Sequence, residues 1–201
     1  GHIERRSAPP GWSQTMRILP RVLACGLAAA WSVGNASRAG ALDSACQALM
    51  DAQIKAVKMP YRVHATIVPA LSGSRSPSGK TPGVDKPTEE DIVFTGTALY
   101  IRIRGRDWKM VPETAEENVA EIRRKAQTSK ATCRQIGEEN VGGEAAVVYI
   151  EHDETESGTV DSKSWISRSR GLPLRMDVTT PRGTTTNRYE YGNVQPPPGV
   201  R

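Results

Sequence analysis

The feature that most constrains the fold is the run of short alternating segments after Cys133. Apolar and polar side chains alternate along each segment, and glycine or proline turn signals recur at intervals of about 8–12 residues. This pattern is typical of an antiparallel meander whose strands each bury one face. The predicted strands cover residues 136–141, 145–150, 163–169, 174–180 and 184–191, with an acidic loop at 151–161.

The first half of the chain mixes helices with strands. Small apolar residues at helical spacing predict one helix over residues 42–57 and a second over 112–129. Alternation predicts strands over 61–68, 92–95, 97–104 and 108–111. Residues 69–90 are rich in Ser, Gly, Pro and Lys, so we expect a long loop there.

Residues 16–41 have the parts of a secretory signal. Arg17 and Arg21 precede an apolar stretch at 22–31, and residues 39–41 have the small side chains that a signal peptidase accepts. We therefore expect export to the periplasm of a Gram-negative bacterium, or secretion, with cleavage after Ala41 or alternatively after Ala36. Residues 1–15 are expected to be a tag or an over-long N-terminus.

Two other interpretations of this segment stay open. Residues 18–33 would also fit a buried core helix, and residues 22–25 resemble a bacterial lipobox whose Cys25 would carry a lipid anchor. Only three apolar residues separate Arg21 from Cys25, which is short for the apolar part of a signal. The whole apolar stretch is shorter than the roughly 20 residues that span a bilayer, so we expect no transmembrane helix in the mature chain.

The net charge of +5 arises mostly in the leader. Residues 1–41 hold five basic residues and one acidic residue, whereas the remainder carries 22 basic and 21 acidic residues. A mature domain so close to neutrality lacks the basic surface that binding to a phosphate backbone requires. The composition therefore argues against nucleic acid as a partner.

Cleavage after Ala41 would leave two cysteines, Cys46 and Cys133. Two cysteines of a small exported domain most often pair, so we predict a Cys46–Cys133 disulfide. It would close a loop of about 87 residues, for which the chain-entropy model gives about 4–5 kcal/mol of stabilisation. Two buried free thiols are the alternative. The absence of a C-x-x-C spacing argues against a thioredoxin-like redox role.

The C-terminal half also resembles a known family. A G-G-x-x-A-x-V-Y turn and strand at 142–150 is followed by S-W-I-S at 164–167, G-L-P-L-R-M at 171–176 and Y-E-Y-G-N-V at 189–194. This order of motifs resembles the LolA/LolB-like superfamily of periplasmic lipoprotein carriers and their relatives, in which a W-I…G-L-P-L-R segment joins two adjacent strands.

The resemblance implies an α+β fold: a curved antiparallel β-sheet, an incomplete barrel, with two helices on its concave side. It also implies an apolar cavity between sheet and helices that takes acyl chains. The single domain would span residues 42–194, followed by a disordered tail at 195–201. The chain has a single Phe, Phe94, whereas a true lipoprotein carrier would be expected to be rich in large apolar side chains, so only the architecture is carried over.

The apolar rows of the predicted strands are the candidate ligand site. Such rows are first of all core, and the functional interpretation is that some of them line a ligand cavity. The residues assigned to this apolar concave face are Leu99, Ile101, Ile103, Leu174, Met176, Val178, Tyr189 and Tyr191.

Other patterns do not indicate catalysis. A P-loop-like segment at 73–81 has five residues between its glycines instead of four, and Pro82 prevents the helix that the motif needs. The polar run at 151–156 offers metal-ligand side chains but is typical of a solvated charge run. The mature chain has two histidines, His64 and His152, and no G-x-S-x-G or H-E-x-x-H motif. We expect no enzyme activity, no cofactor and no bound metal.

These patterns predict an exported, monomeric, non-enzymatic binding protein that holds a lipid or another apolar small molecule under its sheet. The alternative is a structural or protein-interaction module of the cell envelope with a filled core and no ligand, whose partner would be an envelope protein. A pocket of several hundred Å³ would favour the first hypothesis, and a filled interior the second.

Overall fold

The computed structural model describes residues 43–70 and 86–200. The predicted leader at 16–41, with Cys25, and the P-loop-like segment at 73–81 lie outside these ranges.

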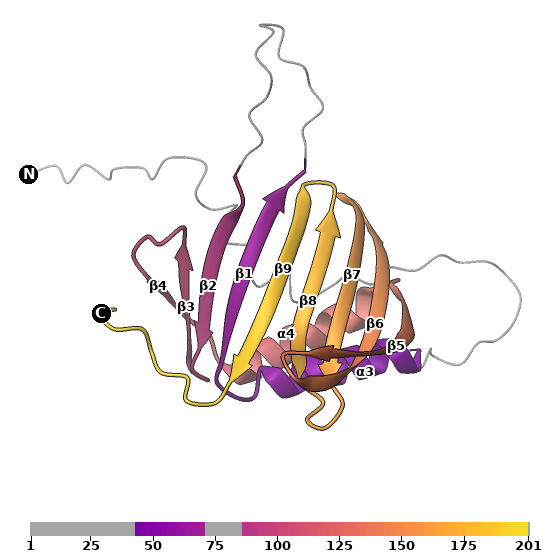
Figure 1. The fold of residues 1–201 in the computed structure, drawn as a ribbon, viewed down its shortest axis with the longest axis horizontal. Coiled ribbons are helices and arrows are strands. Elements are labelled where there is room, and N and C mark those ends of the chain that lie inside the picture. Colours follow the sequence, from indigo (N-terminus) through magenta and orange to yellow (C-terminus); the bar gives the residue numbers. More distant parts are fainter. Residues whose placement is uncertain (1–42, 71–85, 201) are drawn as a thin grey trace, which may run out of the picture.

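Nine antiparallel strands form one curved sheet that does not close into a barrel (Figure 1). Their order across the sheet is β4-β3-β2-β1-β9-β8-β7-β6-β5, so the first strand pairs with the last and joins the two halves of the chain at the centre. The strands are β1 (Tyr61–Pro69), β2 (Thr88–Phe94), β3 (Ala98–Ile103), β4 (Lys109–Pro112), β5 (Thr132–Val141), β6 (Glu144–Thr155), β7 (Gly158–Ser167), β8 (Pro173–Thr180) and β9 (Gly183–Tyr191).

Two helices, α3 (Ser44–Ala56) and α4 (Ala115–Thr128), lie on the concave side of the sheet, behind the strands in Figure 1. The Asp43 carboxylate caps α3 by accepting a hydrogen bond from the Ala45 amide at 3.2 Å. A capping box begins α4: Thr114 Oγ1 accepts from the Glu117 amide, and the Glu117 carboxylate accepts from the Thr114 amide. The fold class and both helices predicted from the sequence are confirmed.

A disulfide joins Cys46 in the first turn of α3 to Cys133 in β5, with the two Cα atoms 5.1 Å apart. The bond predicted from the two cysteines is therefore present in the structure. It fixes the start of α3 to an edge strand of the sheet, and Leu49, Ala52 and Ile166 are buried around it.

Two further apolar clusters lie on opposite faces of the sheet. The larger one, called here the helix-side cluster, packs between the sheet and the two helices and includes Phe94, Val63 and Ile122. The smaller one, the tryptophan cluster, consists of Trp165, Ala146, Val148 and Leu174 with the partly buried Val141 against it. Most of the apolar core thus lies on the concave side.

The predicted bounds of two loops are partly wrong. Strand β2 begins at Thr88, although residues 88–90 were expected to belong to a loop. Strands β6 and β7 form one long hairpin that turns at residues 156–157, so most of the expected acidic loop at 151–161 is strand. In both places charged residues occupy both faces of a strand. The alternation of apolar and polar residues that marks a strand is therefore missing from the sequence. Strand β5 likewise begins at Thr132, four residues before its predicted start.

Candidate functional site

The structure brings together seven of the eight residues predicted to form the ligand face. Five of them are buried in the helix-side cluster, and Ile103 and Tyr191 are partly buried against it. The five buried residues are Leu99, Ile101, Met176, Val178 and Tyr189. They come from β3, β8 and β9, and strands β1 and β2 lie between β3 and β9 in the sheet.

Leu174 lies elsewhere. The pairing of β7 with β8 shifts register between Trp165 and Ile166, and Leu174 packs in the tryptophan cluster instead of the helix-side cluster. An irregularity of this kind interrupts the strict alternation of side chains, so alternation alone assigns Leu174 to the same face as Met176.

The cover of the helix-side cluster is thin on α4. Ile122 is the buried residue of α4, and Ala115 and Val119 are partly buried against the same cluster. The first helix contributes the partly buried Met50 and Ile54. The larger part of the cluster therefore comes from the sheet, and α4 adds little apolar area to it.

The same face of the sheet also carries buried polar side chains. Ser162 and Ser164 are direct cross-strand partners of Val178 and Met176, and Asn187 is the partner of Met176 on the other side. All three polar residues are buried. Polar groups in such a place need hydrogen-bond partners, and the Asn187 amide donates to the Met176 carbonyl at 3.4 Å.

Glu90 is a buried carboxyl group on this face. Its side chain is 3% exposed, and its Oε1 atom has no hydrogen-bond partner in the structure. Burial, together with the nearby charge of Asp91, raises the pKa of Glu90 to about 7. Glu90 is therefore an acid that changes its charge near neutral pH in largely apolar surroundings.

Asp153, in β6, is a second buried carboxyl group. It is 1% exposed, and neither carboxyl oxygen has a hydrogen-bond partner. Its cross-strand partner Val160 packs against the helix-side cluster, which places Asp153 on the concave side as well. Burial raises the pKa of Asp153 above its usual value.

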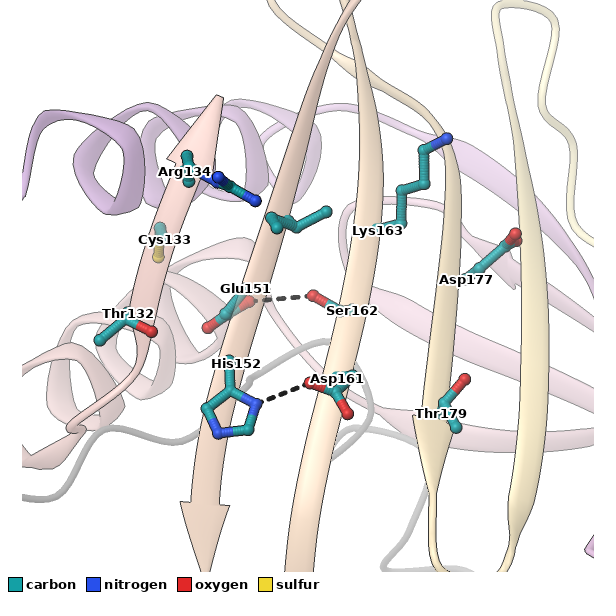
Figure 2. Close-up of a pocket in the computed structure, with 11 residues that line it drawn as sticks. Thr132, Cys133, Arg134, Glu151, His152, Asp161, Ser162, Lys163, Asp177 and Thr179 are labelled. Carbon is teal, nitrogen blue, oxygen red and sulfur yellow. Dashed lines mark hydrogen bonds and ion pairs between the residues drawn. The ribbon is translucent and has the colours of Figure 1, made fainter. Parts of the chain in front are cut away.

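The opposite face carries a groove of about 600 Å³ (Figure 2). Two rows of cross-strand partners from β5 to β8 line it. The first row is Thr132, His152, Asp161 and Thr179, and the second is Arg134, Ile150, Lys163 and Asp177. Most of the residues that line it carry polar or charged side chains, in contrast to those under the helices.

Charged side chains in this groove form ion pairs and hydrogen bonds with oppositely charged neighbours. His152 Nδ1 lies 2.7 Å from Asp161 Oδ1, and this hydrogen bond raises the pKa of His152. The Lys163 ammonium lies 2.8 Å from Glu139 Oε1 and 4.6 Å from the centre of the Trp165 ring. These pairs are solvent-exposed, so each contributes little to stability.

The polar run at 151–156 is not gathered into one site. Because it lies along a strand, Glu151 and Asp153 face the helices while His152 faces the groove. No group of three potential ligands that could hold a metal ion is found in residues 43–70 and 86–200. His64 is also paired, with its Nδ1 atom 2.6 Å from Asp91 Oδ1.

Sequence reasoning missed Glu90 and Asp153. Glu90 falls in the loop predicted from the Ser, Gly, Pro and Lys content of residues 69–90, and Asp153 falls in the acidic loop predicted at 151–161. The signal for Glu90 is the alternation of Glu90, Ile92 and Phe94, which puts the carboxyl group on the apolar face of a strand. No comparable apolar series marks Asp153.

Comparison with known proteins gave structural likenesses only. No family model and no curated protein matches the sequence. The lipoprotein LppX of Mycobacterium tuberculosis is similar with a TM-score of 0.46 and 11% identity over 76% of this chain and 98% of its own. LprF of Mycobacterium bovis gives a TM-score of 0.41 and 17% identity over 78% and 95% of the two chains.

A putative outer membrane lipoprotein-sorting protein domain from Vibrio parahaemolyticus is also similar, with a TM-score of 0.27 and 10% identity over 77% of this chain and 93% of that domain. At these scores the case for a function rests on the residues of this chain.

None of the helices in the described part of the chain is long and apolar enough to span a membrane.

Proposed function

We propose that this chain is an exported binding protein of the cell envelope that holds a lipid or another apolar small molecule between α4 and the concave face of the sheet. The Cys46–Cys133 disulfide supports the compartment, because such bonds persist outside the reducing cytoplasm. The apolar face of the sheet supports the class of ligand.

The observation that carries the proposal is the unequal contribution to the helix-side cluster. The sheet supplies most of its buried side chains, whereas α4 supplies Ile122 as its buried residue. Burial of one such side chain is worth about 1.5–3 kcal/mol. A ligand that covers the same apolar surface can therefore displace α4 at a small cost in free energy.

Displacement of an apolar dye tests the proposal. The mature protein is extracted with organic solvent, refolded and loaded with N-phenylnaphthylamine, and long-chain lipids are then added. We expect saturable dye fluorescence that lipids reverse, together with changed amide hydrogen exchange in α4, β2 and β3. Exchange in the β5–β6 hairpin serves as the internal control and should not change.

A second candidate function is a protein-interaction module. The observation in its favour is that side chains from both helices and the sheet already pack together in the helix-side cluster, while the open polar groove lies on the other face. The same experiment separates the two. Absence of saturable dye binding would reject the apolar-ligand protein and leave the interaction module.

A further inference from the structure

One row of side chains across the concave face has two polar residues between apolar residues at its ends. The register of the sheet aligns Ile103, Glu90, Ala65, Asn187 and Met176 as direct neighbours on five consecutive strands, β3, β2, β1, β9 and β8 (Figure 1). The neighbouring row of Ile101, Ile92, Val63 and Tyr189 is apolar throughout and belongs to the helix-side cluster. The polar residues therefore adjoin the apolar surface directly.

Ala65 separates the two polar residues of this row. Strands of a sheet lie about 4.8 Å apart, so the Cα atoms of Glu90 and Asn187 are separated by roughly 10 Å across Ala65. Ala65 is itself buried, so the helices and their neighbours cover this part of the row in the ligand-free protein. The stretch of the row between the Glu90 carboxyl group and the Asn187 amide group is called here the Glu90 niche.

The carboxyl group in the Glu90 niche lacks a partner that the fold should supply. Glu90 is 3% exposed, and its Oε1 atom makes no hydrogen bond. A buried polar atom left in this state is costly and is rare in native proteins. A bound molecule with a hydrogen-bond donor would remove the cost.

We infer that the apolar ligand of the proposed function carries an uncharged hydroxyl group, and that this hydroxyl binds Glu90 in the Glu90 niche. This inference rests on the proposed function and specifies the ligand class as a hydroxyl-bearing lipid, such as a long-chain alcohol. The hydrocarbon chain covers the row of Ile92 and Val63, and the hydroxyl group lies over Ala65.

A hydroxyl suits the niche better than a charged head group. It donates to the carboxylate and accepts from the protonated acid, so it satisfies Glu90 in either state. A carboxylate or phosphate head group would place a second negative charge beside a buried one. An ammonium group would have to be stripped of water beside Ile103 and Met176, and this desolvation offsets much of its attraction to the carboxylate.

The test compares 1-dodecanol, dodecanoate and dodecylamine, which share one chain length, by displacement of N-phenylnaphthylamine at about pH 8, where Glu90 is mostly ionised. We expect 1-dodecanol to bind about tenfold more tightly than either charged chain, the effect of one hydrogen bond to a charged acceptor. Equal affinities, or tighter binding of the amine, would overturn the hydroxyl assignment.

Two variants locate the effect. Glu90→Gln keeps the shape of the side chain and should abolish the preference for the alcohol over dodecanoate. Glu89→Gln is the matched control, because Glu89 is the exposed neighbour on the opposite face, and it should leave the preference unchanged. An unchanged preference in the Glu90→Gln protein would contradict the inference.

A measurement on the unaltered protein tests the inference without depending on the fold of the variant. Carbon NMR of the Glu90 carboxyl group should show its pKa falling when 1-dodecanol binds, because a donor stabilises the carboxylate. An unchanged pKa with the alcohol bound would overturn the assignment. If none of the three dodecyl compounds displaces the dye, the proposed function itself is rejected. If all three bind with equal affinity, only the assignment of a hydroxyl group to Glu90 is rejected.

Discussion

Cys46 and Cys133 connect α3 to β5, the outermost strand at one end of the sheet, across 87 positions of sequence. The bond thereby holds a covering helix to the sheet at the end opposite β4. Within the described part of the sheet, strand β5 pairs only with β6, so the disulfide gives this edge strand a second, covalent attachment.

Removing this link should destabilise the fold strongly. A Cys46→Ser/Cys133→Ser protein should lose about 4–5 kcal/mol of unfolding free energy in urea, because its denatured chain regains the entropy of an open loop. The unaltered protein under a reducing agent should match the double variant. Two titratable thiols in the unreduced protein would contradict the structure.

Trp165 should be the most sensitive position on the face away from the helices. Its ring is buried, lies 4.6 Å from the Arg175 guanidinium, and donates its Nε1 hydrogen to Glu139 at 2.7 Å. Trp165→Ala should cost about 3–5 kcal/mol in chemical denaturation. Trp108→Ala is the control, because Trp108 is only half-buried beside Arg102, and we expect less than half that loss. Equal losses would show that the tryptophan cluster contributes no more to stability than the surroundings of Trp108.

Glu90 should make the ligand-free protein less stable as the pH rises. Burial and the charge of Asp91 raise its pKa from 4.5 to about 7 in the folded state. Between these two values the folded state holds more protons than the unfolded state, so the stability present at low pH falls on passing upward through this window. The difference between the two pKa values corresponds to a loss on the order of 3 kcal/mol above neutral pH.

Glu90→Gln should remove this fall. Thermal melts of the ligand-free proteins from about pH 4 to about pH 8 should show the variant gaining on the native protein as the pH rises. Glu89→Gln should instead follow the native curve. Parallel curves for the native and Glu90→Gln proteins would mean that Glu90 ionises as freely as it does in the unfolded chain.

The capping box of α4 offers a way to loosen the cover without touching the apolar cluster. Thr114→Ala removes the acceptor of the Glu117 amide and should cost about 1 kcal/mol. Amide exchange should accelerate in the first turns of α4, while Thr114→Ser should behave like the native protein. If exchange in α4 is unchanged, the helix is held by contacts other than its cap.

Much of the architecture could be predicted from the sequence because the apolar strands alternate cleanly. The segment 61–68 and the segment 184–191 show their period directly, and β1 and β9 occupy almost the same residues in the structure. The cysteine pair was equally predictable, because only one pairing, Cys46 with Cys133, remains if residues 16–41 are a leader that is cleaved, as predicted.

The rest could not be predicted because the deciding information is not local. The register shift that moves Leu174 to the tryptophan cluster depends on how β8 meets β7. For Asp153, which stands among other acidic residues, only the pairing with Val160 reveals that it faces the helices. Glu90 has a short sequence signal in its alternation with Ile92 and Phe94, and its pairing with Ala65 places it on that face. The seven residues that do meet in the helix-side cluster remain a proposed ligand surface.

Native mass spectrometry of the purified, disulfide-bonded protein tests the central claim most directly. We predict a population heavier than the polypeptide by one apolar molecule, which organic extraction removes and added lipid restores. The bare polypeptide mass before extraction, after extraction and after incubation with lipid would contradict the account.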